Sequence, residues 1–182
     1  MEDSSRDAKR FQYERFILSQ LLVMALKGVP AFYLPALLAS ENDIKSFSMT
    51  GQRRDLNREK FKSENLSAVL NNPESNANKN LKYLRNAMDV RSELKQFHPC
   101  SQMKCLSKGR SDIVVIKRGK GPESVFAIHN MTENKINYQL NDNDLPKIID
   151  NDFNTHDFLT STKYNCKNIS LDPFQVIWLS AL

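Results

Sequence analysis

The strongest constraint on the fold is an apolar stretch near the N-terminus. Between Phe16 and Ala39 the only charged residue is Lys27. A run this apolar resembles a membrane span, but Gly28 and two prolines interrupt it. Its unbroken part, residues 16–26, makes about 16 Å of helix, roughly half of a bilayer core. We therefore expect a buried core helix and no membrane segment.

The pattern around this stretch predicts a helix followed by a buried strand. Residues 5–27 are expected to form the helix, capped by Asp3, Ser4 or Ser5 and ended by Gly28. Residues 29–34 read VPAFYL, which is typical of a short buried strand. A helix, a tight turn and such a strand form half of a parallel α/β unit.

A central parallel strand needs a neighbour on each side, and we expect only one strand within residues 1–97. The apolar helix likewise has no evident cover elsewhere in the chain. The pattern is therefore that of the tail of a larger α/β protein.

A long polar stretch follows the predicted strand. Residues 35–65 include SEND at 40–43 and GQRRDLNR at 51–58, and a loop of this length is uncommon unless it has a function. We expect a short helix at 66–70. A clearer helix is predicted at 76–97, where Leu81, Leu84 and Met88 form an apolar stripe.

In the second half of the chain, the sequence predicts short strands separated by turns. Strong candidates lie at 112–118, 124–130 and 174–179, and weaker ones at 136–140 and 169–171. Close spacing of this kind predicts a small antiparallel β domain. We therefore expect two domains, 1–97 and 98–182.

Composition narrows the class of protein. The chain of 182 residues has a formal net charge of +5, which is far from that of a dedicated nucleic-acid binder. Its three cysteines form no disulfide framework or zinc pattern, and the mixed charges of residues 1–15 are unlike a secretory signal. We expect a cytoplasmic protein with no metal or organic cofactor.

The order and spacing of several motifs carry a family resemblance. They are GVPAFY at 28–33, LLASEND at 37–43, GQRRDLNREK at 51–60, AIHNMT at 127–132 and LDPFQVIW at 171–178. In this combination the chain resembles the sucrose phosphorylase branch of glycoside hydrolase family 13, in the α-amylase superfamily. That branch also includes sucrose-6-phosphate and glucosylglycerate phosphorylases.

The resemblance implies a fold and a reaction. Residues 1–97 would be the last part of a (β/α)8 catalytic barrel: helix seven, strand eight, its long loop and helix eight. Residues 98–182 would be the C-terminal β domain. The reaction implied is a retaining glucosyl transfer from an α-glucoside to inorganic phosphate, giving glucose 1-phosphate. The family's catalytic carboxylates precede strand eight, so this fragment by itself is expected to be inactive.

The resemblance also assigns roles to residues of the long loop. Arg54 takes the position of an arginine that holds the sugar hydroxyls, work that suits a planar guanidinium. Asp43, Asp55, Asn57 and Arg58 are expected to support the loop by local hydrogen bonds.

The basic residues of this loop alternate with acidic ones and have no interleaved aromatic apart from Phe61, which argues against nucleic acid and is more compatible with phosphate. In the β domain we interpret His129 as a hydrogen-bonded strand residue and Trp178 as a core residue.

A competing hypothesis is a non-catalytic β-domain module for carbohydrate or protein interaction. A fragment of a barrel should expose the apolar sides of residues 16–26 and 29–34 and bind hydrophobic dye. A true module should melt cooperatively as a monomer or a defined oligomer.

Overall fold

The computed structural model describes residues 10–57, 60–141 and 154–180, so the predicted helix caps at Asp3, Ser4 and Ser5 lie outside the described residues. The chain divides into two compact units. One is formed by Met1–Pro30 together with Ala87–Leu182, and the other is Ala31–Asn86. The predicted domains, 1–97 and 98–182, stay a prediction.

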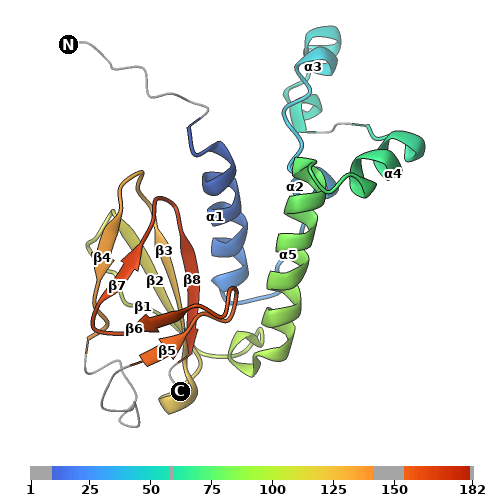
Figure 1. The fold of residues 1–182 in the computed structure, drawn as a ribbon. Helices are drawn as coiled ribbons and strands as arrows, with labels where there is room; N and C mark the ends of the chain where they lie inside the picture. The colour runs from blue at the N-terminus through green and yellow to red at the C-terminus, as the bar shows by residue number, and fades with distance from the viewer. Residues whose placement is uncertain (1–9, 58–59, 142–153, 181–182) are drawn as a thin grey trace, which may run out of the picture. The chain divides into compact units, whose positions relative to one another are not determined.

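The first unit is built on a four-stranded antiparallel sheet in the order β1-β2-β3-β8 (Figure 1). Its strands are β1 (Met103–Cys105), β2 (Ile113–Arg118), β3 (Val125–Asn130) and β8 (Val176–Ser180). The short helix η3 (Gly121–Glu123) joins β2 to β3, which pair from Ile113 opposite Asn130 to Arg118 opposite Val125. The three strong strand predictions are confirmed, each within two residues of its predicted ends.

Strand β3 is buried on both of its faces, and all six of its residues are buried. Helix α1 (Gln12–Ala25) lies along one face of the sheet (Figure 1). Leu21, Met24 and Ala25 of this helix have no exposed surface. The expectation that nothing in this chain covers the apolar helix is therefore wrong: the β sheet covers one side of it.

The other face of the sheet holds the main core. Short strands lie over this core: β4 (Ile136–Tyr138) pairs with β7 (Ile169–Leu171), and β5 (Asn154–His156) pairs with β6 (Lys163–Asn165). The core residues are Ile113, Val115, Phe126, Ile128, Leu140, Cys166, Ile169, Leu171, Ile177 and Leu179. Trp178 is fully buried as predicted, and its ring packs 4.7 Å from that of Phe97.

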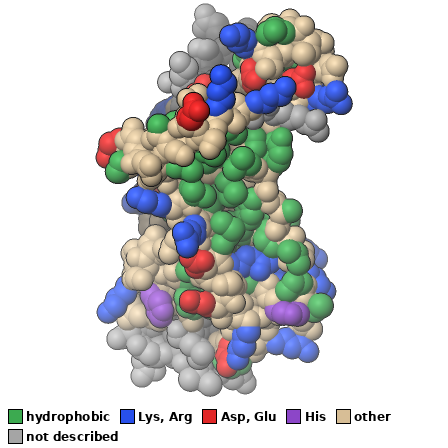
Figure 2. All heavy atoms as spheres, turned by 90° about the vertical axis from the view of Figure 1, so that its right-hand side faces the viewer, with side chains coloured by type: hydrophobic (Ala, Val, Ile, Leu, Met, Phe, Trp, Pro, Cys, Tyr) green, Lys and Arg blue, Asp and Glu red, His purple; other side chains and the backbone are tan. Residues whose placement is uncertain are grey.

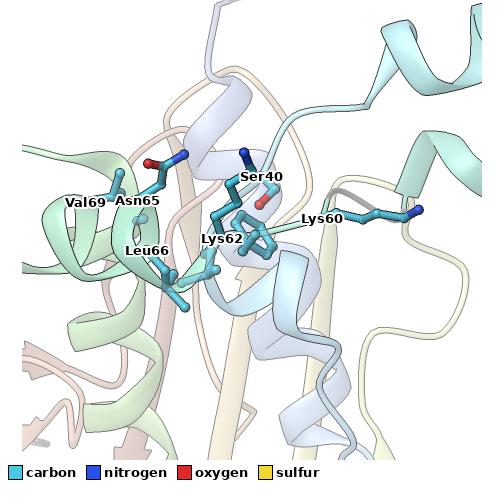
Figure 3. A pocket seen from close by; sticks show the side chains of 9 residues that line it. Ser40, Lys60, Lys62, Asn65, Leu66 and Val69 are labelled. Carbon is cyan, nitrogen blue, oxygen red and sulfur yellow. The ribbon is translucent and has the colours of Figure 1, made fainter.

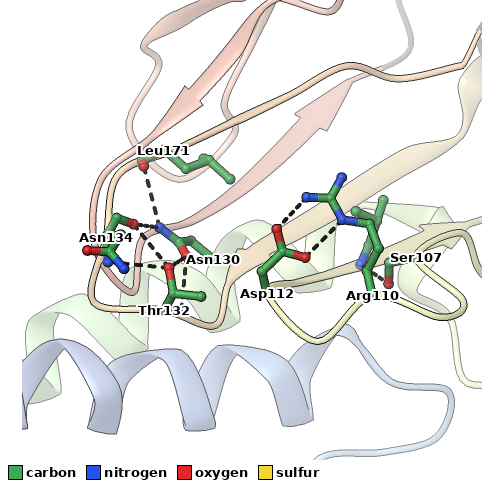
Figure 4. A network of polar contacts seen from close by, with 8 residues as sticks. Ser107, Arg110, Asp112, Asn130, Thr132, Asn134 and Leu171 are labelled. Atoms are coloured by element: carbon green, nitrogen blue, oxygen red, sulfur yellow. Dashed lines mark hydrogen bonds and ion pairs between the residues drawn. The ribbon is translucent and has the colours of Figure 1, made fainter.

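The AIHNMT segment ends in a polar network that fixes the turn after β3 (Figure 4). Asn130 is fully buried, and its Nδ2 donates to the carbonyl oxygens of Asn134 at 2.7 Å and Asp172 at 2.8 Å. Its Oδ1 accepts from the backbone N–H of Thr132 at 2.9 Å. A buried amide with these partners joins the ends of β3 and β7.

Arg91 joins three separate segments of the same unit. Its guanidinium donates to the carbonyl oxygens of Met24 at 3.0 Å, Gly28 at 2.9 Å and Phe97 at 2.9 Å. Burial lowers the pKa of Arg91. The planar fork of donors suits this three-way contact, and a cation at the C-terminal end of α1 is favoured by the helix dipole.

A second arginine, Arg118, also donates hydrogen bonds to backbone carbonyl oxygens. Arg118 is fully buried in β2, and it donates to the carbonyl oxygens of Ala25 at 3.1 Å and His98 at 3.0 Å. Burial, together with the charge of Arg91, lowers the pKa of Arg118. The two guanidinium carbons lie 5.5 and 5.6 Å from the centre of the Phe97 ring.

The second unit is helical. It contains α2 (Leu34–Leu37), α3 (Ile44–Thr50), the 3-10 helix η1 (Arg53–Asn57), α4 (Ser63–Asn71) and the first part of α5 (Asn76–Glu93). Helix α5 ends earlier than predicted, and the 3-10 turn η2 (Lys95–Phe97) follows it. The short helix expected at 66–70 is confirmed as part of α4. The stretch expected to be a loop, 35–65, instead holds α2, α3 and η1.

The strand predicted at 29–34 is wrong for this structure. Leu34 begins α2, and residues 29–33 belong to no strand in the described part of the chain. Val29 is 80% exposed and Tyr33 is 55% exposed. A strand needs a neighbouring backbone for its N–H and C=O groups, and within the described residues none pairs with this segment.

Candidate functional site

The predicted site residues cluster in the second unit, where α3 and η1 pack as a helical hairpin. Asp43 is the N-cap of α3: it accepts from the backbone N–H of Ser46 at 2.9 Å and from its Oγ at 2.5 Å. These hydrogen bonds hold the pKa of the Asp43 carboxyl below its ordinary value. The backbone N–H of Asp43 donates to the carbonyl of Leu56 at 2.8 Å, which ties the start of α3 to η1.

The other end of the hairpin is held by Asp55. The Oγ1 of Thr50 donates to its carboxylate at 2.5 Å, and the Asp55 N–H donates to the carbonyl of Gln52 at 2.9 Å. Gly51 sits between them with a φ of 67°, a conformation that glycine adopts without strain. Asp43 and Asp55 therefore bind opposite ends of one short hairpin.

Arg54 lies on η1 between these anchors, and its side chain is exposed to solvent. Asn57 is also exposed and ends η1. Arg58 lies outside the described residues. The structure thus places Arg54, Asp55 and Asn57 on one 3-10 turn, with Asp43 hydrogen-bonded to that turn through Leu56.

A pocket of about 240 Å³ lies in the same unit, between the end of α2 and α4 (Figure 3). Its apolar lining comes from Leu38, Phe61, Leu66, Val69 and Ala77, and its polar lining from Ser40, Lys60, Lys62 and Asn65. Lys62 and Asn65 lie together, whereas Lys60 extends away from them (Figure 3).

The pocket's lining holds no acidic residue among those described, so it offers cations, an amide and apolar surface but no general acid. Sequence reasoning grouped Lys60 and Lys62 with the basic residues of the loop and missed the pocket, because its apolar side comes from α4, α5 and two residues outside the helices, Leu38 and Phe61.

Sequence reasoning also missed Asn80. This residue of α5 is fully buried, and its Nδ2 donates to the carbonyl oxygens of Ala36 at 2.9 Å and Leu37 at 2.8 Å. Asn80 thus supplies hydrogen bonds to the backbone carbonyl groups at the C-terminal end of α2. The available signal was an asparagine in register with Ala77, Leu84 and Ala87 on the apolar side of the helix.

In residues 10–57, 60–141 and 154–180, no cluster of three His, Cys, Asp or Glu side chains is placed to hold a metal ion. No helix in the same part of the chain is long and apolar enough to span a membrane.

Comparison with known proteins finds similar phosphorylases. No family model matches the chain. Over 130 residues, 71% of the chain, it is 31% identical to a glucosylglycerate phosphorylase of Allomeiothermus silvanus. It is 22% identical over 165 residues, 91% of the chain, to a glucosylglycerate phosphorylase of Escherichia coli K12.

The chain resembles the phosphorylases of glycoside hydrolase family 13, as its motifs predict. It matches only 23% and 28% of the length of these two relatives, so it spans about a quarter of each.

Solved structures of family 13 enzymes share the fold. The match to trehalose-6-phosphate hydrolase of Bacillus licheniformis covers 96% of this chain and 40% of that enzyme's chain. Its TM-score is 0.66 and the sequence identity is 16%. The match to an Anoxybacillus α-amylase covers 92% of this chain and 32% of that enzyme's chain. Its TM-score is 0.65 and the sequence identity is 15%. The fold is that of the last part of an α-amylase-family (β/α)8 barrel followed by a small antiparallel β domain.

Proposed function

We propose that this chain is the C-terminal part of a glycoside phosphorylase. The full protein transfers a glucosyl group from an α-glucoside to inorganic phosphate and releases glucose 1-phosphate. The similarity to glucosylglycerate phosphorylases over 71% of the chain carries this proposal. It favours glucosylglycerate over sucrose as the glucoside, although the motifs resemble the whole branch that also acts on sucrose and sucrose 6-phosphate.

In this proposal the chain supplies substrate contacts and the rest of the protein supplies the chemistry. A retaining transfer needs a carboxylate nucleophile and an acid/base. By the resemblance these groups lie on parts of the barrel that precede residue 1, so the isolated chain releases no glucose 1-phosphate.

Arg54 is the residue proposed to bind the sugar. It is exposed on η1, which is tied to α3 by the Thr50–Asp55 and Asp43–Leu56 hydrogen bonds. A short hairpin anchored in this way fixes the backbone of the turn, so that binding does not have to order the backbone. A planar guanidinium donates to two sugar oxygens at once, which an ammonium does not. Asp43, Asp55, Asn57 and Arg58 have the role of holding the loop.

A chimera tests the activity. The matching segment of the Allomeiothermus silvanus phosphorylase is replaced by this chain, and release of glucose 1-phosphate from glucosylglycerate and from sucrose is measured with phosphate present. We expect phosphorolysis, with glucosylglycerate the better substrate. A folded chimera without activity would contradict the proposal, and so would release of glucose 1-phosphate by the isolated chain.

Arg54→Lys in the same chimera tests the sugar contact. A charged hydrogen bond contributes about 1.5–3 kcal/mol, so kcat/KM should fall by about 10- to 100-fold. The matched control is Arg53→Lys, a neighbour on η1, which should change kcat/KM by less than about twofold. Equal losses from both substitutions would show that Arg54 has no special role.

A further inference from the structure

The structure and the family resemblance assign helix α1 to different parts of the protein. By the resemblance it is a helix of the catalytic barrel. In the structure it forms one compact unit with the β sheet, in which Met1–Pro30 lie together with Ala87–Leu182. The side of α1 that is buried on the sheet consists of Ile17, Leu18, Leu21, Met24 and Ala25. This side is therefore not free to pack on a barrel.

The outer side of α1 is also apolar over most of its length. After Glu14 and Arg15 the helix carries no charged residue. Phe16 and Val23 are two helical turns apart and share the side opposite the sheet. Phe16 is half-buried, whereas Val23 and Leu26, the residue that follows the helix, are exposed. A helix that is apolar all round is covered on most of its sides, so α1 lacks cover on its outer side.

The C-terminal end of α1 is fixed before any partner binds. Arg91 and Arg118 donate to the carbonyl oxygens of Met24, Ala25 and Gly28. Two guanidiniums from different elements set the position of the helix on the sheet and also its rotation about its own axis. The outer side therefore has a preformed orientation, which lowers the conformational entropy that docking would cost.

The comparisons indicate what covers this outer side. The chain spans 23% and 28% of two phosphorylase relatives, and its fold is that of the last part of a (β/α)8 barrel followed by a β domain. In such barrels the helices form an outer ring on the strands, so each helix packs one side on the barrel. The outer side of α1 has no charge after Arg15, so the surface that covers it is apolar too.

We propose that α1 is shared between two domains. Its inner side packs on the β unit, and its outer side, through Phe16, Val23 and Leu26, docks the preceding part of the catalytic barrel. The helix would then form the joint between the barrel and the β domain. The proposal rests on the proposed function, because it takes the partner to be the barrel of a phosphorylase.

Cysteine labelling in the chimera with the Allomeiothermus silvanus phosphorylase tests the proposal. Val23→Cys and Leu26→Cys are made separately in the isolated chain and in the chimera, and reaction with a maleimide is followed on the peptide that carries the new cysteine. We expect both to react about tenfold or more slowly in the chimera than in the isolated chain. The control is Lys108→Cys, in the exposed turn between β1 and β2, which should react equally fast in both. Equal rates at Val23 and Leu26 in the two proteins would overturn the proposal.

Thermal melting gives a second readout. Val23→Gln/Leu26→Gln should lower the melting temperature of the chimera by about 1–3 °C, because it places polar groups in the joint. The same change should leave the isolated chain as it was, because both side chains are exposed there. An equal loss in both proteins would contradict a joint with the barrel.

Labelling and melting are measured whether or not the chimera releases glucose 1-phosphate. A folded, inactive chimera with protected cysteines would therefore contradict the proposed activity and support the docking surface, and an active chimera with unprotected cysteines would do the reverse. If this chimera does not fold, the Escherichia coli relative, which matches 91% of the chain, replaces it as the host.

Discussion

At the residue scale, the connection after α2 contains a backbone conformation that its side chain does not favour. Ala39 has a φ of 49°, in the left-handed region. The N–H of Ser40 donates to the carbonyl of Pro35 at 2.9 Å, which is the closing bond of a helix C-terminal motif that usually has glycine at this place.

We expect Ala39→Gly to stabilise the chain by about 0.5–1 kcal/mol, because glycine adopts this φ without steric cost. Ala68→Gly is the matched control. Ala68 lies exposed within α4, where the same substitution should destabilise by about 0.5–1 kcal/mol. Urea unfolding of both variants checks the two opposite signs, and a loss of stability in both would contradict the conformational argument.

A second prediction at this scale concerns His129, the hydrogen-bonded strand histidine expected from the sequence. It is fully buried, and its Nδ1 lies 3.2 Å from the carbonyl oxygen of Val114. Burial lowers the pKa of His129 from 6.5 to about 4. The unfolded chain therefore takes up a proton at a pH where the folded chain does not.

The stability due to neutral His129 is present above pH 6.5 and is lost as the pH falls from 6.5 to about 4. The loss should reach about 3 kcal/mol at the lower end. Urea unfolding at several pH values checks this, with His129→Met as the comparison that removes the titrating group. If the two proteins lose stability in parallel over this range, the histidine is not responsible.

At the element scale, the attachment of α1 depends on Arg91. One guanidinium binds the last turn of the helix at Met24, the following turn at Gly28 and the 3-10 turn at Phe97. Arg91→Lys keeps the charge but cannot make three separate contacts, so we expect a loss of about 1–3 kcal/mol. The control is Arg85→Lys, at an exposed position of α5, the helix that also carries Arg91. It should lower the free energy of unfolding by less than about 0.5 kcal/mol. Chemical denaturation of both variants compares them, and equal losses would show that the three carbonyl contacts contribute nothing.

At the scale of the whole molecule, the chain keeps apolar surface that its own described residues do not cover. Hydrophobic side chains reach the surface on the face shown in Figure 2. Val23 of α1 is 45% exposed and the residue that follows the helix, Leu26, is 43% exposed, although the helix buries its opposite side. Surface of this kind is expected if a quarter-length piece has lost the neighbours that cover it in the full protein.

We therefore expect the isolated chain to bind a hydrophobic dye, and Val23→Gln/Leu26→Gln to reduce the dye's fluorescence. The helical circular dichroism signal should be unchanged, because both positions are exposed and glutamine is a good helix former. Ser19→Gln, another exposed position on α1, is the control and should leave dye binding as it was. A chain that binds no dye and melts cooperatively would favour the alternative of an independent non-catalytic module.

The sequence by itself determined most of the regular elements, because hydrophobic periodicity reports local structure directly. The strands around Val115, Ile128 and Ile177 and the stripe of α5 were visible in this way. The family motifs also located Arg54 on the loop, although its sugar contact stays a prediction that the structure does not test.

Only the tertiary structure decided how these elements pack and hydrogen-bond to one another. Strand β3 is buried on both faces, since α1 packs on one side and the short strands cover the other. The segment at Val29 did not become a strand, because strand formation depends on partner backbone groups and not on the residues alone. The contacts of Arg91 likewise join residues far apart in sequence, which no local pattern encodes.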